Sequence, residues 1–309
     1  MTETMLRASQ MNERDPQTLQ LWMARSILGL AITTVGLMAL GSATRVMNAG
    51  LSCPDWPLCY DSVFPASQMN LQVFLEWFHR VIATLVGLVT IGLTGLAWFW
   101  RRSLPAWAPP LVSLALLLVV FQGVLGGLTV TELLRFDIVT AHLGTGLAFF
   151  GTLLTIGCLL LPRTALEPVP LGNLRWFGLV AVGLVYGQSI LGALVASQWA
   201  LHQCFGTQQL CMVMNRHLLG IIPATVSTLV LVIVAMRHKV LPKQLRSLIH
   251  GTGMLLFCQL LIGFATFRLR LQVEPLTVAH QAIGALLLGS LIAFTVLTWR
   301  QTSYNLIKD

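Results

Sequence analysis

Eight apolar stretches, each about 20 residues long, constrain the fold of this chain more than any other feature. In lipid, backbone polar groups must be hydrogen bonded within their own segment, so such stretches form membrane-spanning α-helices. Charged residues make up only 10% of the chain, against about 25% in a soluble domain. We therefore predict an all-α integral membrane protein. The predicted spans are 22–44, 77–99, 108–130, 139–161, 175–197, 215–236, 247–267 and 277–299.

The basic residues predict the orientation of these spans. If the N-terminus is cytoplasmic, thirteen of the 19 lysines and arginines lie on the inner side, as the positive-inside rule requires. Both termini are then cytoplasmic. The net charge of +8 is a topology signal and not a nucleic-acid-binding patch, because the charges are not clustered. The polar N-terminal segment before the first span lacks the apolar core of a signal peptide, and a bacterial inner membrane fits best.

Four histidines stand at matching places in two halves of the chain. The separation between His79 and His142 is equal to the separation between His217 and His280. The same shift along the chain therefore relates His79 to His217 and His142 to His280. The segment Gln122–Gly127 likewise has a similar counterpart around Gln259. We expect two similar four-helix halves with parallel topology. The expected division is a tail at 1–21, halves at 22–161 and 175–299, a linker at 162–174 and a tail at 300–309.

All four histidines fall near the outer ends of inward-running spans, so they are expected at similar depth. Two imidazoles facing each other across a helix bundle can bind the iron of one haem. Neighbouring glycines would let a flat macrocycle approach the backbone, and outer arginines can pair with haem propionates. The glycines are Gly144, Gly220 and Gly284, and the arginines are Arg80, Arg216, Arg268 and Arg270.

An acidic residue, Glu76, is present beside a histidine in the first half and absent from the corresponding position of the second half. It precedes His79 by three residues and so shares its helix face, whereas the corresponding residue before His217 is Met214. A di-iron site needs two Glu-x-x-His motifs, and the chain has one in this arrangement. A carboxylate beside one haem site favours proton transfer or charge stabilisation there. The half without it favours electron transfer or a structural role.

Each half also carries two cysteines in a predicted outer loop. The pairs are Cys53 with Cys59 and Cys204 with Cys211. On the oxidising side of the membrane, such a pair can form a disulfide. The sequence leaves open whether it acts as a structural staple or in redox chemistry, and it does not offer the four ligands of a zinc site.

With these residues assembled, the chain resembles the haem A synthase family, in its cysteine-bearing bacterial branch, over about residues 22–299. The resemblance rests on Glu76-x-x-His79-Arg80, His142, Asn215-Arg216-His217, His280 and the loop cysteines. It implies a cell-membrane oxidoreductase that converts the C8 methyl of haem O to the formyl group of haem A by successive hydroxylations. It also implies that Glu76 is catalytic, that His79 and His142 hold the substrate haem O, and that His217 and His280 hold a haem b cofactor.

The resemblance further implies partners. These are the farnesyltransferase that makes haem O, the assembly of cytochrome oxidase, membrane lipid and an electron acceptor that the sequence does not identify. The oligomeric state stays open, as does the dissociation of an axial histidine during turnover. A di-haem electron-transfer cytochrome b is the alternative, but it needs neither Glu76 nor the contrast with Met214. A transporter built from parallel repeats explains the duplication but not the four histidines.

Overall fold

The computed structural model describes residues 16–162, 171–197 and 208–302. It contains eight long helices that are apolar and long enough to cross a membrane, which confirms the predicted all-α fold. A 3-10 turn, η1 (Ala66–Gln68), precedes α3. The long helices are α2 (Pro16–Val46), α3 (Leu71–Phe99), α4 (Ala108–Thr131), α5 (Phe136–Leu160), α6 (Leu174–Ser197), α8 (Gln208–Arg237), α9 (Lys243–Arg268) and α10 (Glu274–Thr302).

Several helices extend beyond the predicted apolar spans. Helix α3 begins at Leu71 because the Asn70 side chain accepts a hydrogen bond from the N–H of Val73 at 2.9 Å and caps the helix. His79 is therefore the ninth residue of its helix. Helix α2 begins at Pro16, within the predicted tail of residues 1–21. Most of the predicted linker lies outside the described residues.

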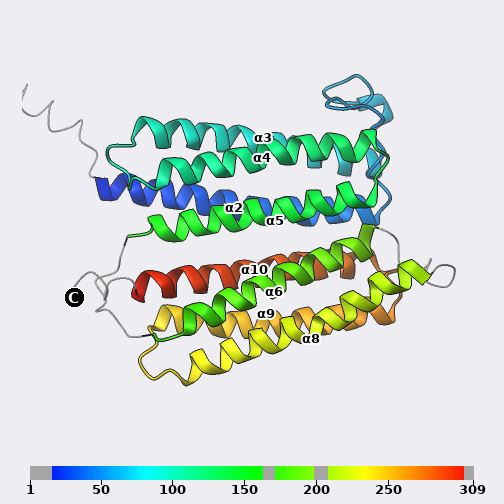
Figure 1. The fold of residues 1–309 in the computed structure, drawn as a ribbon. Coiled ribbons are helices and arrows are strands. Elements are labelled where there is room, and N and C mark those ends of the chain that lie inside the picture. Colours follow the sequence, from blue (N-terminus) through cyan, green and yellow to red (C-terminus); the bar gives the residue numbers. More distant parts are fainter. Residues whose placement is uncertain (1–15, 163–170, 198–207, 303–309) are drawn as a thin grey trace, which may run out of the picture.

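The helices contact one another in two closed rings. Figure 1 shows α2 to α5 in one group and α6 to α10 in the other. In the first four helices, α2 and α4 each contact both α3 and α5. In the last four, α6 and α9 each contact both α8 and α10. Consequently α3 and α5 stand on opposite sides of the first ring, and α8 and α10 stand on opposite sides of the second. Histidines on opposite helices can therefore face each other across the middle of each ring.

The two rings meet along α2, α5, α6 and α10, and most of the largest fully buried side chains lie on these helices. Ile156, Leu291 and Phe294 are fully buried there. Glycines allow close approach of the helices: a Cβ atom on Gly289 would lie 2.7 Å from the Phe150 ring. Many leucines and valines of α4, α8 and α9 are exposed instead, as expected for helix faces that contact lipid.

Two arginines join the rings at opposite ends of the seam. Arg45, near the end of α2, donates a hydrogen bond to the carbonyl of Ala196 on α6. Arg300, near the end of α10, donates to the carbonyls that close α5, at Cys158 and, at 2.8 Å, Leu161. Carbonyls at helix ends lack intrahelical partners, so each arginine satisfies free acceptors while fixing one ring against the other.

Candidate functional site

The four histidines lie on two helices in each ring. His79 lies on α3 and His142 on α5, and His217 lies on α8 and His280 on α10. Each pair comes from two helices on opposite sides of one ring. Each ring thus presents two imidazoles to its own interior.

A glycine on the preceding helix lies against each imidazole. A Cβ atom added at any of the four glycines would fall between 2.7 and 3.5 Å from an atom of the ring. Because ring atoms rarely approach a Cβ this closely, a larger residue at most of these sites would displace the imidazole. The pairs are Gly41 with His79, Gly126 with His142, Gly192 with His217 and Gly263 with His280.

Three of these glycines follow a glutamine by four residues, one helical turn earlier on the same face. Gln122 Nε2 donates to the carbonyl of His142 at 2.6 Å. Gln188 Nε2 donates to the carbonyl of His217 at 2.8 Å and lies 3.0 Å from its Nδ1. Gln259 Nε2 lies 3.4 Å from Nε2 of His280. Each glutamine therefore contacts the histidine that its glycine supports.

Three glycines that follow the histidines lie against side chains of the protein. A Cβ atom on Gly284 would lie 3.1 Å from Gln259, and one on Gly220 would overlap Gln188. A Cβ atom on Gly144 would meet Ile190 of α6 at 2.8 Å. Gly284 also lines the cavity beside His217 and His280, and the expectation that these three glycines admit a macrocycle stays a prediction.

In the last four helices, the histidine pair opens into a cavity of about 410 Å³, within the usual range for binding sites of small molecules and cofactors. His217, His280, Gln188 and Gln259 line it together with mainly apolar side chains. Nδ1 of His280 is buried and, within the described residues, has no hydrogen-bond partner. A paired imidazole set in an apolar cavity fits a haem held through its iron. Nδ1 of His142 is buried without such a partner too.

Glu76 lies one turn before His79 on α3 and is 4% exposed. Its Oε1 accepts a hydrogen bond from Arg80 Nη2 at 2.5 Å, and its Oε2 accepts one from the backbone N–H of Cys53 at 2.8 Å. Buried carboxylates require such partners. A carboxylate oxygen has two lone pairs, so each oxygen keeps capacity for a further proton donor.

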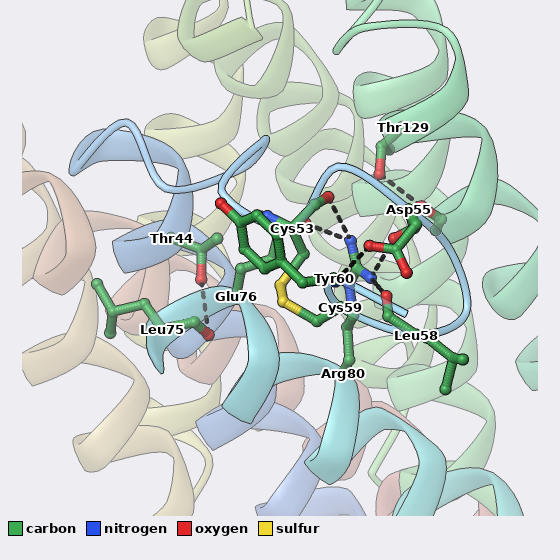
Figure 2. A network of polar contacts seen from close by, with 11 residues as sticks. Thr44, Cys53, Asp55, Leu58, Cys59, Tyr60, Leu75, Glu76, Arg80 and Thr129 are labelled. Carbon is green, nitrogen blue, oxygen red and sulfur yellow. Dashed lines mark hydrogen bonds and ion pairs between the residues drawn. A yellow bond between two sulfur atoms is a disulfide. The ribbon is translucent and has the colours of Figure 1, made fainter. Parts of the chain in front are cut away.

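Arg80 fastens the loop before α3 to this carboxylate (Figure 2). Besides Glu76, its guanidinium donates to three backbone carbonyls of the loop. Those carbonyls belong to Cys53, Asp55 and Leu58. The predicted pairing of Arg80 with a propionate is therefore wrong. The planar guanidinium is hydrogen bonded to Glu76 and to the loop carbonyls. Arg216, Arg268 and Arg270 are exposed.

The loop is closed by a disulfide between Cys53 and Cys59 (Figure 2), and both cysteines are buried. The Asp55 carboxylate accepts hydrogen bonds from the N–H groups of Tyr60 and Asp61 at 2.6 and 2.8 Å. Slight burial tends to raise the pKa of Asp55, but the donors at Asp61 and Tyr60, aided by the charge of Arg80, lower it below its usual value. The loop thus covers the Glu76 end of the first ring as a rigid cap.

The second ring lacks this arrangement at the corresponding positions. Met214, which corresponds to Glu76, is buried against Val195, and Leu218 stands where the repeat shift places Arg80. Cys204 and the side chain of Cys211 lie outside the described residues, so their predicted pairing stays a prediction. The two halves therefore differ at the position of Arg80 as well as at the position of Glu76.

The sequence did not identify the glutamines as parts of the site, and it did not predict the protein partners of Arg80, which it paired with a haem propionate instead. The glutamines did leave a signal, because Gln-x-x-x-Gly occurs at 122–126, 188–192 and 259–263. Arg80 left none, since its three carbonyl acceptors are set by the path of the loop. The glutamines connect histidines to the preceding helices, and Arg80 connects Glu76 to the loop before α3.

The chain is similar to known proteins over most of its length. Residues 24–292 match the family model COX15-CtaA, described as cytochrome oxidase assembly protein. The chain is 27% identical to a haem A synthase of Shewanella oneidensis over 91% of this chain and 97% of that protein. It is 33% identical to the human haem A synthase COX15 over 56% of this chain and 52% of that protein. A stretch covering 40% of the chain is 32% identical to 26% of a protoheme IX farnesyltransferase of Halobacterium salinarum.

Proposed function

Because the chain belongs to the COX15-CtaA family of cytochrome oxidase assembly proteins and is a haem A synthase, which oxidises haem O to haem A, we propose that its two rings divide the work. The first four helices bind haem O and carry out the oxidation. The last four hold a haem b. The histidine pairs are alike in both rings, whereas Glu76 and Arg80 occur in the first and are replaced by Met214 and Leu218 in the second. This asymmetry is the observation that carries the proposal.

His79 and His142 are the ligands for the iron of the substrate haem O. They lie on α3 and α5, on opposite sides of the first ring. Gly41 and Gly126 set the positions of their rings. The long farnesyl tail of haem O is apolar, so it can remain in lipid while the macrocycle enters between the helices.

His217 and His280 are the ligands for haem b, in the cavity lined also by Gln188 and Gln259. A bound haem b supplies one-electron transfer. The apolar lining excludes water, and the glutamines orient the imidazoles. Met214 near this pair offers no proton acceptor, which suits a site that moves electrons without altering its haem.

Glu76 accepts a proton during oxidation of the C8 methyl. Two successive hydroxylations convert the methyl to a gem-diol, which loses water to give the formyl group. Each takes an oxygen atom from water and releases two protons and two electrons. Each hydroxylation requires the loss of protons near the reacting carbon, and a positioned carboxylate provides a general base. Arg80 and the N–H of Cys53 hold one lone pair on each oxygen, so the carboxylate is fixed in orientation and still able to accept.

The cellular setting follows from the charges and the chemistry. The protein is a multi-pass membrane protein, and its role is in cytochrome oxidase assembly. The excess of basic residues on one side supports cytoplasmic termini, with the disulfide loop and both histidine pairs toward the outer, oxidising side. Haem O reaches it from a farnesyltransferase, and haem A passes on toward cytochrome oxidase. The electrons leave through an acceptor of the membrane.

Extraction and mass analysis of the bound haems tests the proposal. The protein is purified from a host that also makes haem O. Haem A or its hydroxylated intermediate beside haem b is the expected result. Haem b alone, in the presence of available haem O, would instead indicate an electron-transfer cytochrome.

A further inference from the structure

An arginine from the first ring borders the cavity of the second ring. Arg45 lies near the end of α2, yet it lines the same cavity as His217 and His280. Among the described residues that line this cavity, Arg45 is the only one with a formal charge. The positive charge of the cavity therefore comes from outside the ring that holds its histidines.

The guanidinium of Arg45 has no acidic partner within the described part of the chain. It takes part in no ion pair there, and its one hydrogen bond goes to the carbonyl of Ala196. Residues 198–207, which follow α6 in the sequence, contain no aspartate or glutamate. A guanidinium has five N–H donors, and arginines in membrane-spanning helices almost always pair with another group. Most donors of Arg45 are therefore available to a ligand of the cavity.

A buried hydroxyl on α10 also borders this cavity. Thr277 is 8% exposed and lines the cavity, and its Oγ1 has no hydrogen-bond partner among the described residues. Buried polar side chains in native proteins are mostly hydrogen bonded, so an unpaired hydroxyl beside a cavity indicates a polar group of a ligand. Thr277 precedes His280 by three residues, which places it about one turn earlier on the same face of α10.

The packing of α2 against α10 brings Arg45 and Thr277 to a similar level. Gln281 Nε2 on α10 donates to the carbonyl of Met38 on α2 at 3.4 Å. The two helices run in opposite directions (Figure 1), so Arg45, seven residues after Met38, and Thr277, four residues before Gln281, lie toward the same end of the seam. At a rise of about 1.5 Å per residue, the two offsets are about 10 Å and about 6 Å, and the long side chain of an arginine can span the difference.

We propose that Arg45 and Thr277 form a carboxylate-binding site at one end of the second-ring cavity. A planar guanidinium matches the two oxygens of a carboxylate, and a threonine hydroxyl can donate a further hydrogen bond. The inference rests on the proposed function, because the carboxylate is then a propionate of haem b. Arg216, Arg268 and Arg270, which the sequence offered for such pairing, do not line the cavity. The first ring thus supplies the cation for the cofactor of the second.

Haem b and its dimethyl ester distinguish a carboxylate-binding site from apolar packing alone. The full chain carrying His142→Ala is produced without haem, so that only the histidine pair of the second ring can bind iron. Each form of the haem is titrated into this protein, and binding is followed by visible absorption. We expect the ester to bind about tenfold or more weakly than the free acid, because hydrogen bonds between charged groups are the strong ones.

Variants of the two residues, made in the same protein, test each part of the site. In Arg45→Met, the free acid should bind about tenfold or more weakly and the ester nearly as before, so the preference disappears. Arg45→Lys keeps the charge without the planar donors and should retain part of the preference. Thr277→Val removes only the hydroxyl and should reduce the preference less. Thr266→Val is its matched control and should leave the preference unchanged, because Thr266 lines the cavity but donates to the carbonyl of Ile262 at 2.8 Å.

The outcomes separate this inference from the function on which it rests. Equal binding of acid and ester by the His142→Ala protein would assign Arg45 to another anion, such as a lipid phosphate, and would overturn the inference alone. So would a preference that survives Arg45→Met or that is lost in Arg268→Met instead. If the His142→Ala protein binds neither form, or if a further His280→Ala leaves binding unchanged, the proposed function fails and the inference with it. If Arg45→Met does not fold, the preference of the His142→Ala protein and its reduction in Thr277→Val still decide the question.

Discussion

Oε2 of Glu76 accepts a hydrogen bond from the backbone N–H of Cys53 at 2.8 Å. This contact joins the acid of the first ring to a residue of the disulfide. Any change that loosens the loop therefore acts on the carboxylate, although the loop lies outside the ring of histidines.

Removal of the disulfide should lower haem A formation while leaving haem b in place. In Cys53→Ser with Cys59→Ser, the loop is no longer closed, and the N–H of Cys53 is held less firmly against Glu76. A disulfide in a short loop typically contributes about 2–4 kcal/mol to the stability of the fold. Measurement of both haems after extraction tests this expectation. Cys158→Ala, at a buried free cysteine, is the control and should retain normal haem A output.

Substitution of Arg80 should release both the loop and the acid. Arg80→Ala leaves Glu76 buried without its ion-pair partner, which typically costs about 3–5 kcal/mol, and it frees three loop carbonyls. We expect faster hydrogen exchange in residues 53–62 and loss of haem A formation. Arg80→Lys keeps the charge but not the planar fork of donors, so its effect should be smaller. Unchanged exchange in Arg80→Ala would contradict the assigned role.

The loop should become less stable in acid because of Asp55. The folded state lowers the pKa of Asp55, through the N–H groups of Asp61 and Tyr60 and the charge of Arg80. Its stabilising contribution is thus complete above the ordinary pKa of an aspartate, about 3.9, and is lost as the pH falls through the lower pKa of the folded state. Limited proteolysis across this pH range measures the effect. Asp55→Asn should show similar cleavage throughout it.

The two histidine pairs should lose different haems. His142→Ala removes a ligand of the first ring, so haem O and haem A should be lost while haem b stays bound. His280→Ala removes a ligand of the second ring, so haem b should be lost or weakened. Absorption spectra and extraction of each variant provide the measurement. Loss of haem b from His142→Ala, with haem O retained, would reverse the assignment of the rings.

The helices and the histidine pairs could be predicted from the sequence because their signals are local or periodic. Apolar runs of fixed length define the spans, and the equal spacing within each half places His79 with His142 and His217 with His280. The helix ends were less predictable, since Asn70 caps α3 well before the apolar run begins at Trp77. Arg80 could not be given its partners, because they are backbone carbonyls 22 to 27 residues earlier, in a loop without regular structure.

The glutamines could be predicted from the sequence only in part. Their spacing from glycine was visible, and the repetition around Gln122 and Gln259 was part of the predicted duplication. Only the structure shows that each side chain reaches a histidine on the next helix, because helix packing brings them together.

The most direct test of the central claim is analysis of the haems bound by Glu76→Gln, expressed with a supply of haem O. The variant keeps the size of the side chain but replaces one acceptor oxygen with an amide that cannot serve as a base. The account predicts bound haem O and haem b, with neither haem A nor the hydroxylated intermediate. Haem b serves as an internal measure of folding. Normal haem A in this variant would contradict the catalytic role of Glu76.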